Sequence, residues 1–112
     1  MAKSGVKLLF HNSHRSLEAE LQQWLGQVNG QVTIHRTMMD SNQYGHCLVV
    51  QYEMSGGPVY RAKVIYDRRH DGLEEQANAL LAEANQAATP LVALGSNDYG
   101  HCLCLIDVAP EK

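Results

Sequence analysis

Alternating apolar and polar residues mark six stretches of the chain as strands, and two longer stretches carry a helical stripe. Apolar side chains recur at every second position of residues 5–10, which predicts a strand with Val6, Leu8 and Phe10 on one face. Residues 17–28 carry apolar side chains three and four positions apart, which predicts an amphipathic helix. A second such stripe runs from residue 73 to about residue 88. The remaining predicted strands cover residues 32–38, 46–54, 59–66, 91–94 and 101–108.

This βαββ-βαββ order reflects a tandem duplication. Residues 41–48 read SNQYGHCL and residues 96–103 read SNDYGHCL, so seven of eight positions are identical. Upstream, the first strand and the helix of each repeat align at an offset of 56 residues, one more than the offset of the turns. This alignment places His14 over His70. The helices keep only their pattern, since a packing face needs only apolar residues of suitable size. The turns keep their letters, which indicates either a function or a backbone that needs Asn and Gly; turn chemistry alone does not require Tyr or His.

The pattern predicts an α+β fold, a six-stranded and mostly antiparallel sheet with both helices on one face. We expect one domain of residues 1–112, with repeats at 5–54 and 58–108 joined by a tight Ser-Gly-Gly-Pro connection. The last strand of each repeat is apolar on both faces, so one sheet face lacks a cover. Self-association through this open sheet face, giving a homo-oligomer, is therefore expected.

Polar residues before each helical stripe indicate how the helices begin. Ser13 or Ser16 is suited to cap the first helix, because a serine hydroxyl accepts a hydrogen bond from the first backbone amides. Asp71 with Glu74 three residues later predicts a capping box for the second helix.

The direction of the chain predicts that four polar loops and both helix N-termini share one rim of the sheet. Helix N-termini attract anions, tyrosines offer stacking surfaces, and the Arg and His side chains of the loops add positive charge. These features suit a phosphorylated or nucleotide-like ligand. The candidate ligand-binding residues are Ser41, Asn42, Tyr44, His46, Ser96, Asn97, Tyr99, His101, His14, Arg15, Arg68, Arg69 and His70.

Composition limits the classes of function. A net charge of -3 argues against binding a nucleic-acid polymer. The apolar runs are far shorter than a membrane span, and the N-terminus has no apolar signal core, so we expect a cytoplasmic protein without a membrane partner. The three cysteines lie in apolar strands and are expected to be reduced, buried thiols.

Three functions remain as hypotheses. The first is a non-enzymatic, oligomeric protein that binds a small ligand at the repeated turns, for example sequestering or sensing a cyclic nucleotide. The second is a hydrolase like the paired-histidine phosphodiesterases, using His46 and His101 as acid and base; the hydroxyl residue that those enzymes carry two positions after the histidine is missing here. The third is a protein-interaction module. No catalytic residue and no cofactor is assigned. No metal site is assigned either, because adjacent residues such as His46 and Cys47 point to opposite faces of a strand.

Parts of each half resemble a known family. Val6-Lys7-Leu8, Phe10, His14, Leu17-Glu18 and the segment VVQYE at residues 49–53 are similar to the small sporulation-associated proteins built from a single βαββ unit. The resemblance implies the fold of each repeat and no catalytic residue. The element order also resembles that of dodecins, flavin-binding oligomers, in topology alone.

Overall fold

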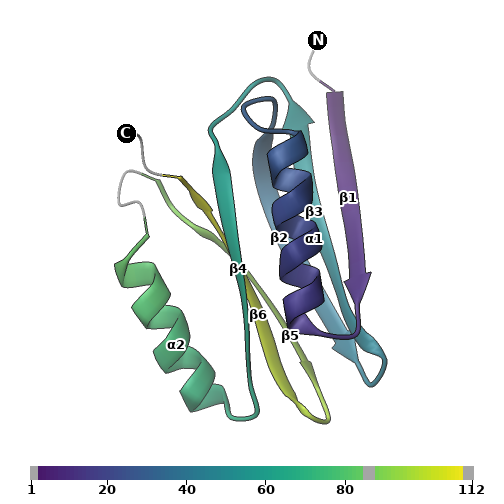
Figure 1. Cartoon of the computed structure of the whole chain (residues 1–112), viewed down its shortest axis with the longest axis vertical. Coiled ribbons are helices and arrows are strands. Elements are labelled where there is room, and N and C mark those ends of the chain that lie inside the picture. Colours follow the sequence, from purple (N-terminus) through teal and green to yellow (C-terminus); the bar gives the residue numbers. More distant parts are fainter. Residues whose placement is uncertain (1–2, 85–87, 110–112) are drawn as a thin grey trace.

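The computed structural model describes residues 3–84 and 88–109 and confirms an α+β fold in the order βαββ-βαββ (Figure 1). The first half contains β1 (Lys3–His11), α1 (His14–Gln27), β2 (Thr33–Asn42) and β3 (Gly45–Met54). The second contains β4 (Tyr60–Asp67), α2 (His70–Ala82), β5 (Leu91–Asn97) and β6 (Gly100–Val108). Helix α2 ends before the predicted residue 88; residues 85–87 lie outside the described part of the chain. Strands β2 and β5 extend further than predicted, into the repeated turns.

The six strands form two three-stranded antiparallel sheets, in the orders β1-β3-β2 and β4-β6-β5, where the sequence led us to expect one sheet. The last strand of each repeat lies in the middle of its sheet. The registers match, since Leu8 faces Val49 in the first sheet and Val64 faces Cys104 in the second. Strands β2 and β5 lie close together where the two sheets meet: a Cβ added to Gly95 of β5 would lie 3.1 Å from Cγ of Met39 in β2.

Each helix packs on one face of its own sheet, and the two halves then stack. Helix α1 contributes four buried residues, of which Trp24 contacts the ring of Tyr52 in β3 at a centroid distance of 5.3 Å. The second sheet lies between the helices, as Figure 1 shows at β4. Alternation along β6 explains this, because Cys102, Cys104 and Ile106 enter the core shared with α1 while the residues between them face α2. Buried residues of both repeats thus form one core cluster.

The starts of the two helices differ from each other. The hydroxyl of Ser13 accepts a hydrogen bond from the amide of Ser16 at 3.1 Å, as expected for an N-cap. The predicted capping box at Asp71 is wrong: the N-cap of α2 is Arg69, and no side chain caps it. Because the helix already begins at His70, Asp71 lies in its first turn and forms an ion pair with Arg69 at 2.7 Å.

The loops that precede the helices and the two repeated turns lie at the same end of the molecule, the lower end in Figure 1. The repeated turns also touch, since the side-chain nitrogen Nδ2 of Asn97 donates a hydrogen bond to the backbone carbonyl oxygen of Asn42 at 3.0 Å. This end is the rim expected from the direction of the chain.

Candidate functional site

The repeated asparagines build the same turn in both halves. The side-chain oxygen of Asn42 accepts hydrogen bonds from the amides of Tyr44 at 2.8 Å and Gly45 at 3.2 Å. The side-chain oxygen of Asn97 likewise accepts hydrogen bonds from the amides of Tyr99 at 2.8 Å and Gly100 at 3.1 Å. These are Asx-turns, in which the side chain replaces a backbone acceptor. The identity of the asparagines therefore follows from the backbone of the turn.

The repeated glycines are required by close approach of the chain. Gly45 has a φ of 153°, and a Cβ there would overlap the carbonyl oxygen of His11. A Cβ at Gly100 would lie 2.6 Å from the hydroxyl of Tyr66. Turn geometry thus accounts for the Asn and the Gly of the motif, and leaves the serine, tyrosine and histidine to be explained.

The serine and histidine of each motif are hydrogen-bonded to each other. Oγ of Ser41 lies 2.6 Å from Nδ1 of His46, and Oγ of Ser96 lies 2.7 Å from Nδ1 of His101. Each bond joins neighbouring strands, because the serine and the histidine are directly paired across the two strands, one residue from the turn. The bond through Nδ1 fixes the orientation of each imidazole and directs Nε2 away from the serine.

A hollow of about 480 Å³ lies where the two turns meet, and we call it the first hollow. Both repeats contribute to it, together with the loop that leads into α1. Its lining residues are Asn12, Ser13, His14, Asn42, Gln43, Gly45, His46, Tyr66, Asn97 and Tyr99. Five of the thirteen candidate residues (His14, Asn42, His46, Asn97 and Tyr99) are therefore brought together here.

Two histidines and a tyrosine form an aromatic wall in the first hollow. His14 stacks on Tyr66 at a centroid distance of 5.7 Å, and His46 meets the same ring at 6.4 Å with a tilt of 56°. Burial lowers the pKa of His46, and the neighbouring His14 lowers it further. Burial also lowers the pKa of His14, with a smaller contribution from Arg15, while Glu18 opposes it. Both imidazoles are consequently neutral at pH 7.

A second concavity, of about 410 Å³, lies between α2 and strands β5 and β6, and we call it the second groove. Its lining residues are His70, Leu73, Glu74, Ala77, Asn78, Leu94, Ser96, His101 and Leu103. His70, Ser96 and His101 of the candidate set lie here. His46 and His101 thus line different concavities, because each points to the helix side of its own sheet.

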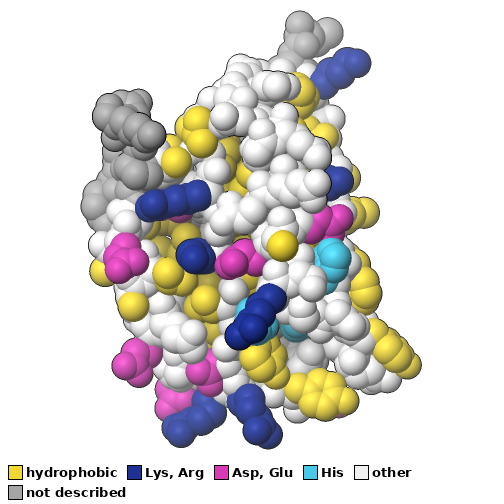
Figure 2. Space-filling view, viewed as in Figure 1, with side chains coloured by type: hydrophobic (Ala, Val, Ile, Leu, Met, Phe, Trp, Pro, Cys, Tyr) yellow, Lys and Arg dark blue, Asp and Glu magenta, His cyan; other side chains and the backbone are white. Residues whose placement is uncertain are grey.

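The remaining candidate residues lie outside both concavities. Tyr44 is 69% exposed at the tip of its turn. Arg68 and Arg69 are exposed in the loop before α2, where Arg69 is already paired with Asp71. Arg15 lines a third concavity, of about 440 Å³, beside α1, together with His14 and Glu18. The positive charge expected at the rim is therefore spread over the surface, as the separated basic side chains in Figure 2 show.

Five residues of the first hollow were not among the candidate residues: Asn12, Ser13, Gln43, Gly45 and Tyr66. Of these, Gln43 and Gly45 belong to the repeated turn that the sequence identified. Asn12 and Ser13 belong to the polar loop before α1. Their position next to His14 in the sequence was the feature that could have identified them. Tyr66 was assigned to the inward face of its strand. Its position as the next-to-last residue of β4 places it at the rim, so its ring covers the core and also lines the hollow.

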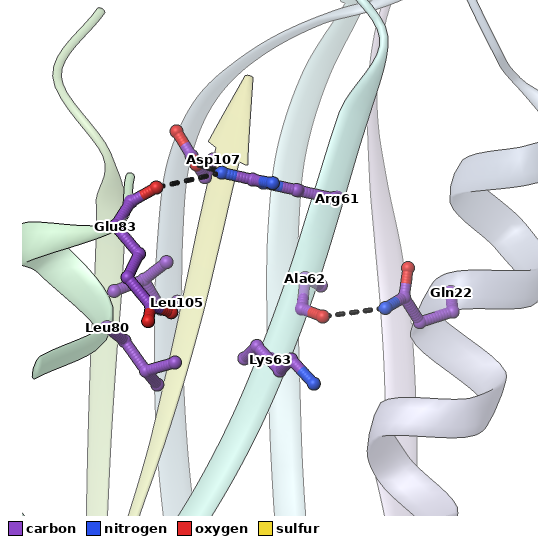
Figure 3. Close-up of a pocket in the computed structure, with 8 residues that line it drawn as sticks. All are labelled: Gln22, Arg61, Ala62, Lys63, Leu80, Glu83, Leu105 and Asp107. Atoms are coloured by element: carbon purple, nitrogen blue, oxygen red, sulfur yellow. Dashed lines mark hydrogen bonds and ion pairs between the residues drawn. The ribbon is translucent and has the colours of Figure 1, made fainter. Parts of the chain in front are cut away.

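A further pocket lies at the seam between the repeats, where α1, β4 and α2 meet (Figure 3). Arg61 donates to Oδ2 of the buried Asp107 from Nε at 3.1 Å and from Nη2 at 2.8 Å, and also to the carbonyl oxygen of Glu83 at 3.3 Å. The guanidinium is thus held by the protein itself, and we assign this pocket to the packing of the repeats.

Metal and thiol chemistry finds little support in the described residues. Residues 3–84 and 88–109 contain no group of three or more His, Cys, Asp or Glu placed to hold a metal ion. Burial raises the pKa of Cys102 and of Cys104 to about 12, so neither thiol ionises near neutral pH. Among the helices of this part of the chain, none has the length and apolar character needed to span a membrane.

Comparison with protein-family models, with curated proteins and with solved structures found no match to this chain. The resemblance to the sporulation-associated proteins stays an expectation from the sequence.

Proposed function

We propose that this chain is a non-enzymatic protein that binds a small phosphorylated or nucleotide-like ligand in the first hollow. One observation carries the proposal: the two copies of the repeated turn meet there, through the hydrogen bond from Asn97 to Asn42, and enclose a hollow with the start of α1. Turn geometry explains the asparagines and glycines, but it does not explain why a histidine follows each glycine.

The phosphate part of such a ligand finds its donors at the start of α1. The first turn of this helix contains no acidic residue, and the backbone amides there carry the positive end of the helix dipole. The hydroxyl of Ser13 and the ring of His14 lie at the same place. Because His14 and His46 are neutral at pH 7, they serve as hydrogen-bonding groups and add no net charge.

The base part of a nucleotide finds aromatic surfaces in the same hollow. Tyr99 is 64% exposed and lines the hollow, and the stacked pair of His14 and Tyr66 lines it as well. Stacking on aromatic side chains contributes about 1–3 kcal/mol per base where it has been measured by substitution. A cyclic nucleotide, with a base and a compact anionic phosphodiester, fits this combination, and sequestering or sensing it would need no chemical step.

The test compares the two histidines that occupy equivalent positions. Native mass spectrometry of the purified protein identifies any ligand that remains bound, and calorimetry with cyclic mononucleotides and dinucleotides measures affinity. We expect His46→Asn to weaken binding at least tenfold, which corresponds to about 1.4 kcal/mol. His101→Asn is the matched control in the second groove and should leave affinity within about twofold. Equal affinity of both variants and the unaltered protein for a ligand found in this way would contradict the proposal.

A second candidate is a hydrolase of the paired-histidine type that uses His14 and His46, because His46 and His101, the pair expected from the sequence, line different concavities. His14 and His46 both contact Tyr66, and their lowered pKa values leave each imidazole available as a general base at neutral pH. In this case His14→Asn should abolish turnover of a phosphodiester while binding persists. Binding of an intact ligand without any product over hours favours the first candidate.

A further inference from the structure

The sheet face that points away from the helix of the same repeat has opposite surroundings in the two halves. In the second sheet it consists of Ala62, Val64, Ala93, Cys102, Cys104 and Ile106, and each of these is at most 5% exposed. The equivalent positions of the first sheet, which we call the bare face, include Val6, Leu8, Phe10, Met38, Cys47 and Val49. There Val6 is 59%, Leu8 61% and Met38 57% exposed. In Figure 2, apolar side chains line the edge of the molecule over β1.

The chain itself shows how such a face is covered. Strand β4, the edge of the second sheet, lies along α1 and is held by two side chains of that helix. Nε2 of Gln22 donates to the carbonyl oxygen of Ala62 at 2.7 Å, as Figure 3 shows, and Oε1 of Glu18 accepts the amide of Val64 at 2.7 Å. These bonds satisfy backbone groups of an edge strand that has no neighbouring strand on this side.

Apolar residues beneath β4 complete this receiving surface of the first repeat. Leu17 and Leu21 of α1 and Leu48 of β3 are fully buried there, and Met39 of β2 packs against the same cluster. The first repeat thus offers a helix with a carboxylate and an amide along its side, and an aliphatic floor between that helix and its last two strands.

The second repeat carries the same receiving surface, and within one chain nothing described fills it. Glu74 and Asn78 occupy the positions of Glu18 and Gln22, and both line the second groove. The equivalents of the aliphatic floor are Leu73, Ala77, Leu94 and Leu103, which line the same groove. Leu94 is 54% exposed, whereas its equivalent Met39 is packed against the core.

We propose that a second copy of this chain inserts β1 and the bare face into the second groove, in the way that β4 and its face lie on α1. Strands β1 and β4 pair with the central strands of their sheets in the same register. The amide of Leu8 and the carbonyl of Val6 therefore lie on the outer edge of β1, where Glu74 and Asn78 of the receiving copy would hold them. The apolar side chains of the bare face would cover Leu94.

The geometry of the chain makes this contact head-to-tail. Strand β1 and helix α2 lie on opposite sides of the molecule, to the right and left in Figure 1. Each chain therefore has one inserting and one receiving surface, and a heterologous contact of this kind builds a closed ring or a filament. The contact uses no residue that the proposed ligand site needs, so either proposal can fail alone.

The test uses two exposed leucines, one on each surface. Leu8→Asp blocks insertion and Leu94→Asp blocks the groove; both side chains are more than half exposed, so folding should persist and circular dichroism checks it. At about 50 µM we expect the unaltered protein to exceed the 12.4 kDa of one chain in native mass spectrometry and light scattering, and each variant alone to be a monomer.

Mixing the two variants separates a head-to-tail contact from a face-to-face dimer. Each retains the surface that the other lacks, so an equimolar mixture should form a 1:1 dimer of the two variants that goes no further. In a symmetric dimer through the bare face, Leu94→Asp would stay dimeric and mixing would restore nothing, which overturns the proposal. A monomeric unaltered protein overturns it as well. Val59→Asp, at a 48% exposed apolar residue outside both surfaces, is the control and should assemble as the unaltered protein does.

Discussion

Glu18 provides the sharpest test of how the two repeats are held together, and we predict that Glu18→Ala destabilises the fold. Its carboxylate accepts the amide of Val64, a residue that is 4% exposed on an edge strand. Removing the acceptor leaves that amide without its partner in a part-buried position. Hydrogen bonds to charged groups contribute about 1.5–3 kcal/mol, and an unsatisfied buried donor costs about 1–3 kcal/mol. We therefore expect a loss of about 2 kcal/mol in the free energy of unfolding.

The duplication supplies a matched control for this measurement. Glu74 has the equivalent position on α2 but is exposed, so Glu74→Ala should change the stability of the monomer by no more than about 0.5 kcal/mol. Glu18→Gln retains a side-chain oxygen acceptor and should fall between the two. The Leu8→Asp background keeps all three proteins monomeric, which removes the contribution of assembly to stability.

Urea unfolding followed by the fluorescence of Trp24 gives the required numbers. This is the chain's single tryptophan, 8% exposed and within the core that joins α1 to both sheets, so its environment changes when the repeats separate. An equal loss for Glu18→Ala and Glu74→Ala would refute the reasoning, because it would show that the contact with β4 contributes nothing. The same result would also remove the support that the packing of β4 on α1 gives to the proposed head-to-tail contact.

Two further predictions concern titration and thiol access. Burial lowers the pKa of His14 and His46 below the ordinary 6.5, so the unfolded chain binds protons more readily than the folded one. Stability should be fully present above about pH 6.5 and decline as the pH falls through the lowered values, and in His46→Asn a urea series from about pH 7.5 to about pH 5 should show a shallower decline. In the monomeric Leu8→Asp background, a thiol reagent should label Cys47 of the bare face quickly, and Cys102 and Cys104 at a rate limited by unfolding, because the latter two are at most 1% exposed. Rapid native labelling of all three would contradict this core assignment.

The candidate site was predictable in part. The repeated letters identified the turns, and the direction of the chain placed them at one rim together with the loops before the helices. The sequence did not show that His46 and His101 would face different concavities, because that depends on how the two sheets stack. It did not show Tyr66 at the rim either, since an aromatic residue near the end of an inward strand face is equally suited to the core.

Sequence alone determined the elements and their order, because periods of 2 and 3.6 residues follow from local backbone geometry and each repeat carries the same pattern. It also determined that one sheet face would lack a cover. Tertiary structure decided that the strands divide into two sheets, that the second sheet lies between both helices, and that only one of two equivalent faces is buried. Packing of whole surfaces makes that choice: the face with small residues, such as Ala62 and Ala93, fits against α1, while the face with Leu8 and Phe10 stays exposed. The local sequence pattern of a repeat does not show which sheet face will pack against α1.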